Sequence, residues 1–282
     1  GKTLFQIATA LALATGKPLF GKFTPNGLRR VLFIGQDAPT WDYAGQTMKL
    51  ARGYGLTDAD LEHAEVDFIL NDGIVLHDAV FLDWLEQWWE ATKFEVLMLD
   101  TLLDIHTMEE NSNTQMRPVM KILKKLRDEM GCAILFSHHT SKGLPGEDRS
   151  PNYRARGATV ISGSSDFHFQ LRQGKDRVDF LWPKGRGVSS LDPPTSFRIE
   201  ETDLPEGPAI TLTSPMVEER ERLIISALDS EPSTRAQLIT IVLAQEPGLG
   251  AQKAAKWVDN QLQMLKKVGS VEQEKRGLWK LV

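Results

Sequence analysis

Gly1-Lys2-Thr3 stands directly before Leu4-Phe5-Gln6-Ile7-Ala8-Thr9-Ala10-Leu11-Ala12-Leu13-Ala14, an apolar run whose pattern predicts a helix. The tripeptide matches the last positions of the phosphate-binding pattern G-x-x-x-x-G-K-[ST], without the strand and the first glycine of the full pattern. In that pattern the Lys reaches the β- and γ-phosphates, the Ser or Thr hydroxyl binds Mg²⁺, and the helix N-terminus adds positive charge. We therefore expect Gly1, Lys2 and Thr3 to bind phosphate, and Thr3 to bind metal.

The rest of the first two hundred or so residues alternates apolar runs with helical patterns. The apolar runs are residues 31–34, 96–99 and 133–136, and the helical stretches are 43–54, 78–91 and 113–130. Such alternation is typical of βαβ units around a parallel sheet. Further strand-like runs, which predict antiparallel strands at one edge of that sheet, are 167–171, 178–182, 197–199 and 209–212. The predicted class is α/β, with a mainly parallel central sheet and antiparallel edge strands.

Prolines and a glycine within residues 205–215 predict a linker that divides the chain into two domains. The core would span residues 1–204. In residues 216–282, three helical stretches precede two short strands around a charged turn, which is the plan of a winged helix. The length of 282 residues accommodates one large and one small domain.

The composition excludes several classes of protein. Hydrophobic residues make up 41% and charged residues 25%, which is ordinary for a soluble globular protein. The single cysteine, Cys132, excludes an intramolecular disulfide and suits a reducing cytosol. We expect a cytoplasmic protein, because no signal peptide and no apolar run of the roughly 18 residues that cross a bilayer is visible. With a net charge of -5, a nucleic-acid role would need local basic patches.

Two acidic residues follow predicted strands. Asp100 comes directly after the run 96–99, and the carboxyl ends of parallel strands are where α/β folds bind ligands. Because Gly1-Lys2-Thr3 lies upstream, we favour a role for Asp100 in holding Mg²⁺ over a role in capping a turn. Asp37 follows the run 31–34, and it either orients and deprotonates an attacking water or caps the next helix.

Ser137-His138-His139 follows the third apolar run. A histidine at a strand end can donate a hydrogen bond to a terminal phosphate. A zinc site is not indicated, because the chain has one cysteine and no helical H-x-x-x-H spacing.

Basic residues gather in two later stretches. The long Gly- and Pro-rich stretch 140–156 suits the phosphate backbone of a nucleic acid, and the alternative is a solvated loop. Its basic side chains are Lys142, Arg149, Arg154 and Arg156. Lys184 and Arg186 lie two apart after the run 178–182, and they form either an ordinary basic turn or a pair that enters a neighbouring subunit's phosphate site.

Together these segments resemble the RecA-like ATPases, above all the hexameric replicative helicases of plasmid RepA type and related phage and bacterial ATPases. The segments that carry the resemblance are 97–102 with His106 and Glu109-Glu110-Asn111, 131–143, and 156–160. The likeness covers roughly residues 1 to 200, and its order of strand, Asp-Thr, polar loop, helix, strand and His-His is specific as a set.

The resemblance implies a role for each candidate residue of the phosphate site. Lys2 and Thr3 would bind the phosphates of ATP and Mg²⁺, and Asp100 would be the Walker B acid. His139, or its neighbour His138, would sense the γ-phosphate.

The resemblance also implies subunit and DNA contacts. Lys184 and Arg186 resemble the K-x-R finger pair that ring-forming members insert into the next subunit. The family usually has Glu where Asp37 stands, so the base would be one methylene shorter here. The loops after Asp100 and after His139 would face a central channel and contact single-stranded DNA.

Residues 216–282 resemble winged-helix modules in general, whose third helix enters the major groove. That helix would present Lys253 and Lys256, and the wing would carry Lys275 and Arg276. Because such modules also dock proteins, duplex DNA and a protein partner both stay open.

The main functional hypothesis is an ATP-driven, ring-forming DNA motor: a replicative helicase or replication ATPase of phage, plasmid or bacterial origin. One alternative is a nucleotide-responsive DNA-binding regulator in which ATP sets the oligomeric state. Another is a RecA-like recombination or repair ATPase, although nothing in the chain resembles the polymerisation segment of that class.

Overall fold

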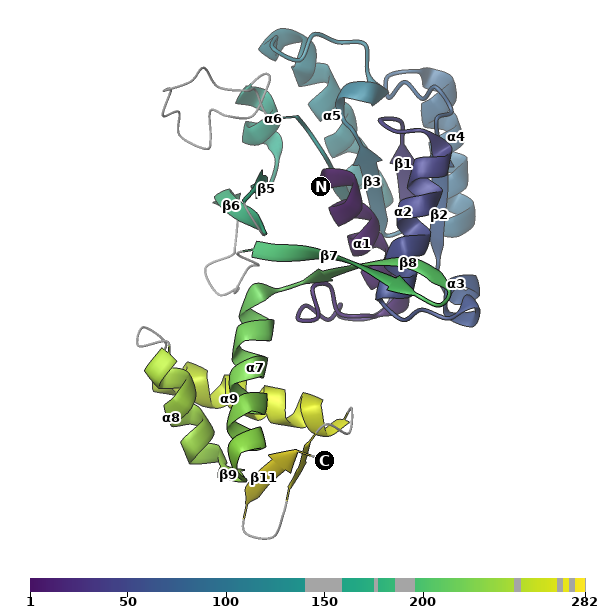
Figure 1. The fold of residues 1–282 in the computed structure, drawn as a ribbon. Coiled ribbons are helices and arrows are strands. Elements are labelled where there is room, and N and C mark those ends of the chain that lie inside the picture. The colour runs from purple at the N-terminus through teal and green to yellow at the C-terminus, as the bar shows by residue number, and fades with distance from the viewer. Residues whose placement is uncertain are drawn as a thin grey trace. The chain divides into compact units, whose positions relative to one another are not determined.

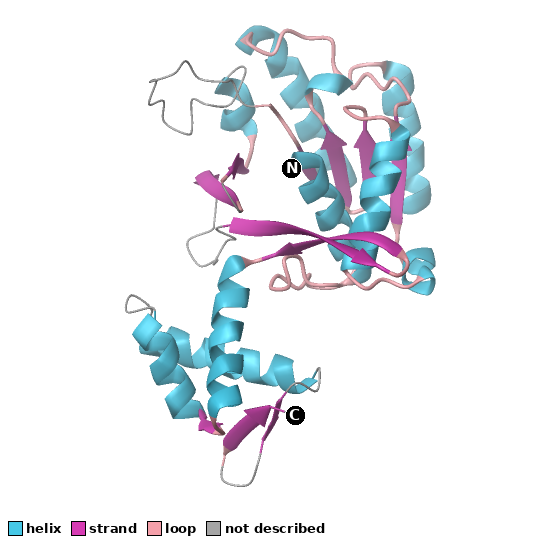
Figure 2. Cartoon of the chain, viewed as in Figure 1, coloured by secondary structure: helices cyan, strands magenta, loops and turns pink. Residues whose placement is uncertain are grey.

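The chain folds into two compact units in a computed structural model, an N-terminal unit, Gly1–Thr213, and a C-terminal unit, Ser214–Val282. The structure describes residues 1–139, 159–174, 177–185, 196–245, 250–267, 271–273 and 277–281. No helix within these ranges is long and apolar enough to cross a membrane. Figure 2 shows the alternation of helices and strands in both units.

A parallel sheet forms the centre of the N-terminal unit (Figure 1). Its strands are β1 (Val31–Gly35), β2 (Val66–Leu70), β3 (Val96–Asp100) and β4 (Ala133–Phe136), in the order β2-β1-β3-β4. Val31 aligns with both Val66 and Val96, so the three strands begin and end together. Their carboxyl ends, which carry the predicted site residues, therefore share one edge of the sheet.

Helices cover both faces of this sheet. They are α1 (Lys2–Thr15), α2 (Thr40–Gly53), α3 (Asp58–His63), α4 (Ala79–Thr92), α5 (Asn113–Met130) and α6 (Thr159–Ser164), with a 3-10 turn η1 (Leu103–Ile105). The predicted bounds of α5 are confirmed: Ser112 accepts a hydrogen bond from the Gln115 N–H at its start, and Gly131 adopts the left-handed conformation at its end.

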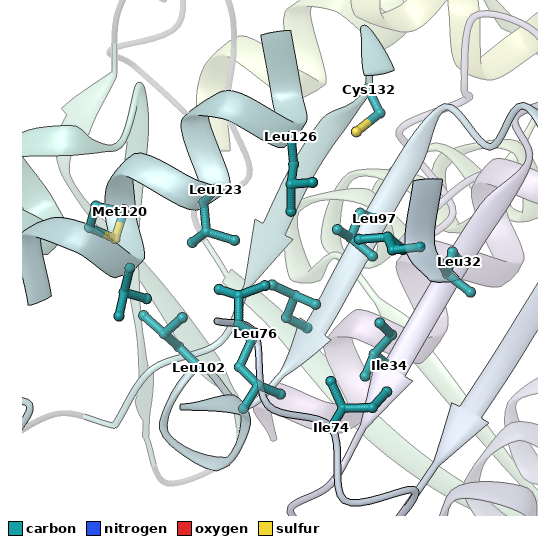
Figure 3. Close-up of a cluster of buried hydrophobic side chains, with 14 of the residues drawn as sticks. Leu32, Ile34, Ile74, Leu76, Leu97, Leu102, Met120, Leu123, Leu126 and Cys132 are labelled. Atoms are coloured by element: carbon teal, nitrogen blue, oxygen red, sulfur yellow. The ribbon is translucent and has the colours of Figure 1, made fainter. Parts of the chain in front are cut away.

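Alternate residues of each strand enter two separate cores, because successive side chains of a strand point to opposite faces. Leu32 and Ile34 join one core with the leucines of α5, as Figure 3 shows. Val31 and Phe33 join the other, with α1 and α2. Burial on both faces explains why these strands are continuous apolar runs rather than alternating ones.

The predicted antiparallel strands exist, but they form a sheet of their own. They are β5 (Phe167–Gln173), β6 (Val178–Gly185), β7 (Ser196–Leu204) and β8 (Gly207–Thr213), in the order β5-β6-β7-β8. Within the described residues none of them pairs with the parallel sheet, so the expectation that they extend its edge is wrong.

The expected linker over 205–215 is also largely replaced by structure. Gly207–Thr213 is strand β8, which pairs with β7 and packs on α2. The approach is close: a Cβ atom at Gly53 of α2 would lie 1.9 Å from the carbonyl oxygen of Ile210. The Pro- and Gly-rich composition therefore marks a hairpin turn and strand, rather than a flexible connection.

In its described residues, the C-terminal unit has three helices around a small core, with three short strands beside them. Its elements are α7 (Pro215–Ser230), β9 (Ser233–Thr234), α8 (Arg235–Gln245), α9 (Ala251–Lys267), β10 (Val271–Gln273) and β11 (Leu278–Leu281). The strands pair antiparallel in the order β10-β11-β9. Leu238, Val258 and Leu262 are buried between the helices, and Trp279 of β11 closes the core.

Candidate phosphate-binding site

The N-terminus of α1 lies at the carboxyl ends of β3 and β4. The Phe5 N–H donates to the Gly1 carbonyl oxygen at 3.0 Å, so the first helical turn starts directly at the tripeptide. The Gln6 side chain donates to the Leu99 carbonyl oxygen at 3.3 Å and anchors α1 to the end of β3. The Lys2 ammonium lies 3.4 Å from His139 Nδ1, beyond the end of β4. Residues that are more than a hundred positions apart thus meet at one edge of the sheet.

Asp100 ends β3 with a fully buried carboxylate that is hydrogen-bonded on both oxygens. Ser137 Oγ donates to Oδ1 at 2.6 Å, and the Tyr43 hydroxyl donates to Oδ2 at 3.2 Å. The peptide bond that follows, Asp100–Thr101, is cis. Because hydrogen bonds to a carboxylate are strong and directional, Asp100 is held in one orientation at the strand end.

Tyr43 reaches Asp100 because Gly35, at the end of β1, has no side chain that would block the Tyr43 ring. A Cβ atom at Gly35 would lie 2.6 Å from the Tyr43 ring. Burial, aided by the negative charge of Asp100, raises the pKa of Tyr43, so its hydroxyl stays protonated and can donate. Nothing in the sequence indicated this role for Tyr43, because it depends on how α2 packs over the strand ends.

The two adjacent histidines have different partners. His139 lies beside Lys2, whereas His138 Nδ1 lies 3.3 Å from Glu110 Oε1, and the side chains of His138 and Glu110 are only 10% and 11% exposed. His106, in the same loop as Glu110, is buried, and burial lowers its pKa. The structure thus brings His139 to the phosphate side and His138 to the loop after β3, a division that sequence reasoning left open. The sequence pattern also gave no indication that Glu110 contacts His138.

Asp37 follows β1 and is exposed, and its N–H donates to the Tyr43 hydroxyl at 3.2 Å. The N-cap residue of α2 is Pro39, so the interpretation of Asp37 as a helix cap is wrong. Within the described part of the chain, no hydrogen bond or ion pair of the Asp37 carboxylate occurs, so the side chain is free to turn toward a ligand.

Other predicted residues lie away from this edge or beyond what the structure describes. Lys253 and Lys256 are exposed on α9 of the C-terminal unit. Lys184 falls on β6, where it aligns with His168, and its side chain is outside the described part. Also outside the described residues are Lys142, Arg149, Arg154, Arg156, Arg186, Lys275 and Arg276.

The polar groups at this edge of the sheet fit a nucleotide phosphate with Mg²⁺. An ammonium at Lys2, a hydroxyl at Thr3 and a carboxylate at Asp100 are the groups that such a ligand pair requires. No cluster of three or more His, Cys, Asp or Glu side chains that could hold a metal occurs in the described ranges, and Mg²⁺ needs none, since phosphate oxygens and waters complete its shell.

Comparison with protein families agrees with this chemistry. A family model described as the AAA domain matches residues 1–144, which is half of the chain. The match spans Lys2, Asp100 and His139, the residues that the fold brings to one edge. The chain therefore belongs to this AAA domain family and is a P-loop ATPase of the AAA/RecA-like kind.

Proposed function

We propose that this ATPase is a ring-forming motor that acts on DNA, with a replicative-helicase type of activity. The observation that carries the proposal is the meeting of Lys2 with His139, next to the buried Asp100–Ser137 pair. This arrangement joins the phosphate-binding helix to the ends of β3 and β4, the strands that precede the two segments proposed to contact DNA. A change at the terminal phosphate can therefore be transmitted to both strand ends.

Each residue has a definite task in the proposed hydrolysis. Lys2 would neutralise the β- and γ-phosphates, and Thr3 with Asp100 would hold Mg²⁺, which would supply charge stabilisation for phosphoryl transfer. Asp37, whose carboxylate is exposed at the end of β1, orients and deprotonates the attacking water. His139 donates a hydrogen bond to the terminal phosphate.

Ring formation and DNA contacts are further parts of the proposal. Lys184 and Arg186 would enter the phosphate site of the next subunit, as an arginine finger does. The loops after Asp100 and after His139 would contact single-stranded DNA in the channel. In the C-terminal unit, the order of helices and strands supports a winged-helix module, with Lys253 and Lys256 exposed on the helix that would approach duplex DNA.

Unwinding of a forked DNA duplex, measured with hydrolysis of ATP, tests the proposal. The chain should be extended at Gly1 to the complete G-x-x-x-x-G-K-[ST] pattern, so that the whole phosphate loop is present. We expect unwinding that Lys2→Ala abolishes and that Lys17→Ala, just beyond the opposite end of α1, leaves intact. Hydrolysis without unwinding would contradict the helicase assignment.

A second candidate is a nucleotide-responsive DNA-binding switch. The exposed Asp37 favours it, because this carboxylate has no described partner that fixes it for catalysis and is shorter than a glutamate. A switch would bind ATP and change its DNA affinity without turnover. DNA binding measured with ATP and with ADP separates the two candidates: a switch shows a large difference in affinity and no hydrolysis.

A further inference from the structure

The turn of residues 36–39, between β1 and α2, carries Asp37 and is held from two sides. On one side stands Tyr43 of α2, which is fully buried, and its hydroxyl accepts a hydrogen bond from the Asp37 N–H at 3.2 Å. On the other side stands Asn71, directly after β2, whose side-chain amide donates to the Ala38 carbonyl oxygen at 2.7 Å. The backbone of the turn is therefore fixed, although the Asp37 carboxylate is exposed.

Asn71 is itself anchored on the end of β1. Its φ angle of 56° lies in the left-handed region, which asparagine adopts more readily than most residues. Its N–H donates to the Gly35 carbonyl oxygen at 2.9 Å. Gln36 adds a second tie, because its side chain donates to the Ile74 carbonyl oxygen at 2.9 Å and accepts from the Ile74 N–H at 2.8 Å. The segment after β2 thus holds both the end of β1 and the turn that follows it.

The Tyr43 hydroxyl stands between the Asp37 backbone and the Asp100 carboxylate. It donates to Asp100 Oδ2 at 3.2 Å while it accepts from the Asp37 N–H. A hydroxyl has a proton to donate and lone pairs to accept, so both hydrogen bonds can be made at once. The Gln36 N–H joins the same two segments through the backbone, since it donates to the Asp100 carbonyl oxygen at 2.8 Å. The end of β3 and the turn after β1 are therefore held at a fixed spacing.

This spacing matters because an aspartate side chain is short. A single methylene group separates its Cα from its carboxylate, so the place of the turn backbone decides how far the Asp37 carboxylate reaches. We propose that Tyr43 is a positioning residue whose hydroxyl sets the distance of the Asp37 carboxylate from the phosphate site. The inference rests on the proposed function, in which Asp37 activates the attacking water. Misplacement of a reacting group by about 1 Å can slow a reaction by about 100-fold.

Steady-state ATP hydrolysis, by the chain extended at Gly1 to the complete phosphate-binding pattern, is the first test. Tyr43→Phe removes the hydroxyl and keeps the ring. We expect kcat to fall by about 10- to 100-fold and KM for ATP to change by less than about 2-fold, because a misplaced base affects the reaction rather than binding. Tyr54→Phe is the matched control. The Tyr54 hydroxyl, just beyond the other end of α2, is buried and has no hydrogen-bond partner among the described residues, so its loss should leave kcat unchanged.

A longer side chain at position 37 tests whether distance is what Tyr43 controls. Asp37→Glu adds a methylene group, so by itself it should lower kcat. In the Tyr43→Phe background, where the turn is released from Asp100, the same change should instead raise kcat by about 3- to 10-fold, because the two sites are coupled. Asn71→Gly tolerates the left-handed backbone and removes the second hold on the turn, so it should lower kcat as Tyr43→Phe does.

Hydrogen exchange at single amides, recorded without nucleotide, separates this inference from the proposed function. Tyr43→Phe should speed exchange at the Asp37 N–H by at least about 10-fold, because that amide loses its acceptor. The Asn71 N–H, bonded to the Gly35 carbonyl oxygen, is the internal reference and should keep its rate.

A complete chain that does not hydrolyse ATP would contradict the proposed function, and the exchange rates would still support or overturn the role of Tyr43. Three results would overturn that role. They are an unchanged exchange rate at Asp37 or an equal rise at Asn71, equal kcat values in Tyr43→Phe and Tyr54→Phe, and losses from Tyr43→Phe and Asp37→Glu that simply multiply in the double variant.

Discussion

Glu110 Oε1 lies 3.3 Å from His138 Nδ1, so the loop after β3 is tied to the end of β4. Both side chains are largely buried, and His139, the next residue, contacts Lys2. The pair therefore connects the loop proposed to contact DNA with the phosphate site. Glu110→Gln keeps the shape of the side chain and removes its charge. We predict that it lowers the stimulation of ATP hydrolysis by single-stranded DNA.

The neighbouring Glu109 is exposed and provides the matched control for this prediction. Steady-state hydrolysis with and without single-stranded DNA is the measurement. Equal stimulation in Glu110→Gln and Glu109→Gln would show that the contact between Glu110 and His138 does not transmit the signal.

We predict that replacing either of two glycines of α2 with alanine changes stability in opposite directions. A Cβ atom at Gly53 would overlap the Ile210 carbonyl oxygen, whereas one at Gly45 would meet nothing within 4 Å. Gly53→Ala should destabilise the N-terminal unit by about 1–3 kcal/mol because β8 must move away. Gly45→Ala should stabilise it by about 0.5–1 kcal/mol, since alanine favours a helix interior. Urea denaturation measures both, and a stabilised Gly53→Ala would contradict the packing of β8 on α2.

Because His106 is buried, we predict that the stability of the folded chain decreases in acid. Because burial lowers its folded-state pKa below the ordinary value of 6.5, the unfolded chain binds the proton more readily. Stability is therefore retained above pH 6.5 and falls as the pH drops from 6.5 toward the lowered pKa. His106→Gln should flatten that part of the curve, while His63→Gln, at an exposed position of α3, should not. Denaturation midpoints recorded across this pH range would reveal an unaltered slope if the prediction is wrong.

Lys253 and Lys256 are exposed on α9, so we predict that they contact the phosphates of duplex DNA. The double substitution Lys253→Ala/Lys256→Ala should weaken binding and reduce the slope of log K against log salt by about 2, because each phosphate contact contributes about 0.9. Lys121→Ala/Lys125→Ala on α5 serves as a charge-matched control. An unchanged salt slope would instead favour protein docking by the C-terminal unit.

The sequence predicted those parts of the fold in which a local pattern matches the final environment. Strands β1, β3 and β4 are continuous apolar runs, and the bounds predicted for α5 and α9 are confirmed. Strand β2 was missed because Asp67 interrupts its run and all its residues are only half-buried. The placement of the antiparallel strands could not be predicted, since the partner of an edge strand is a long-range choice that local periodicity does not encode.

Some residues of the candidate site could likewise be predicted from the sequence, and others could not. Lys2, Asp100 and His139 could be predicted because a motif or a strand end marks each of them, and parallel strands bring their carboxyl ends together. Tyr43 and Glu110 could not, because they reach the site from α2 and from a loop whose paths depend on packing. The exposed position of Asp37 also followed only from the structure.

In the proposed function, Lys2 and Asp100 form one site that hydrolyses ATP in response to DNA. The most direct test is the rate of ATP hydrolysis with and without single-stranded DNA, for the chain completed at its phosphate loop and for its Asp100→Asn variant. We expect strong stimulation by DNA and a loss of at least about 100-fold in the hydrolysis rate of the variant, because the transition-state charge loses its stabilisation. A hydrolysis rate that DNA does not change, or that Asp100→Asn leaves intact, would contradict this proposal.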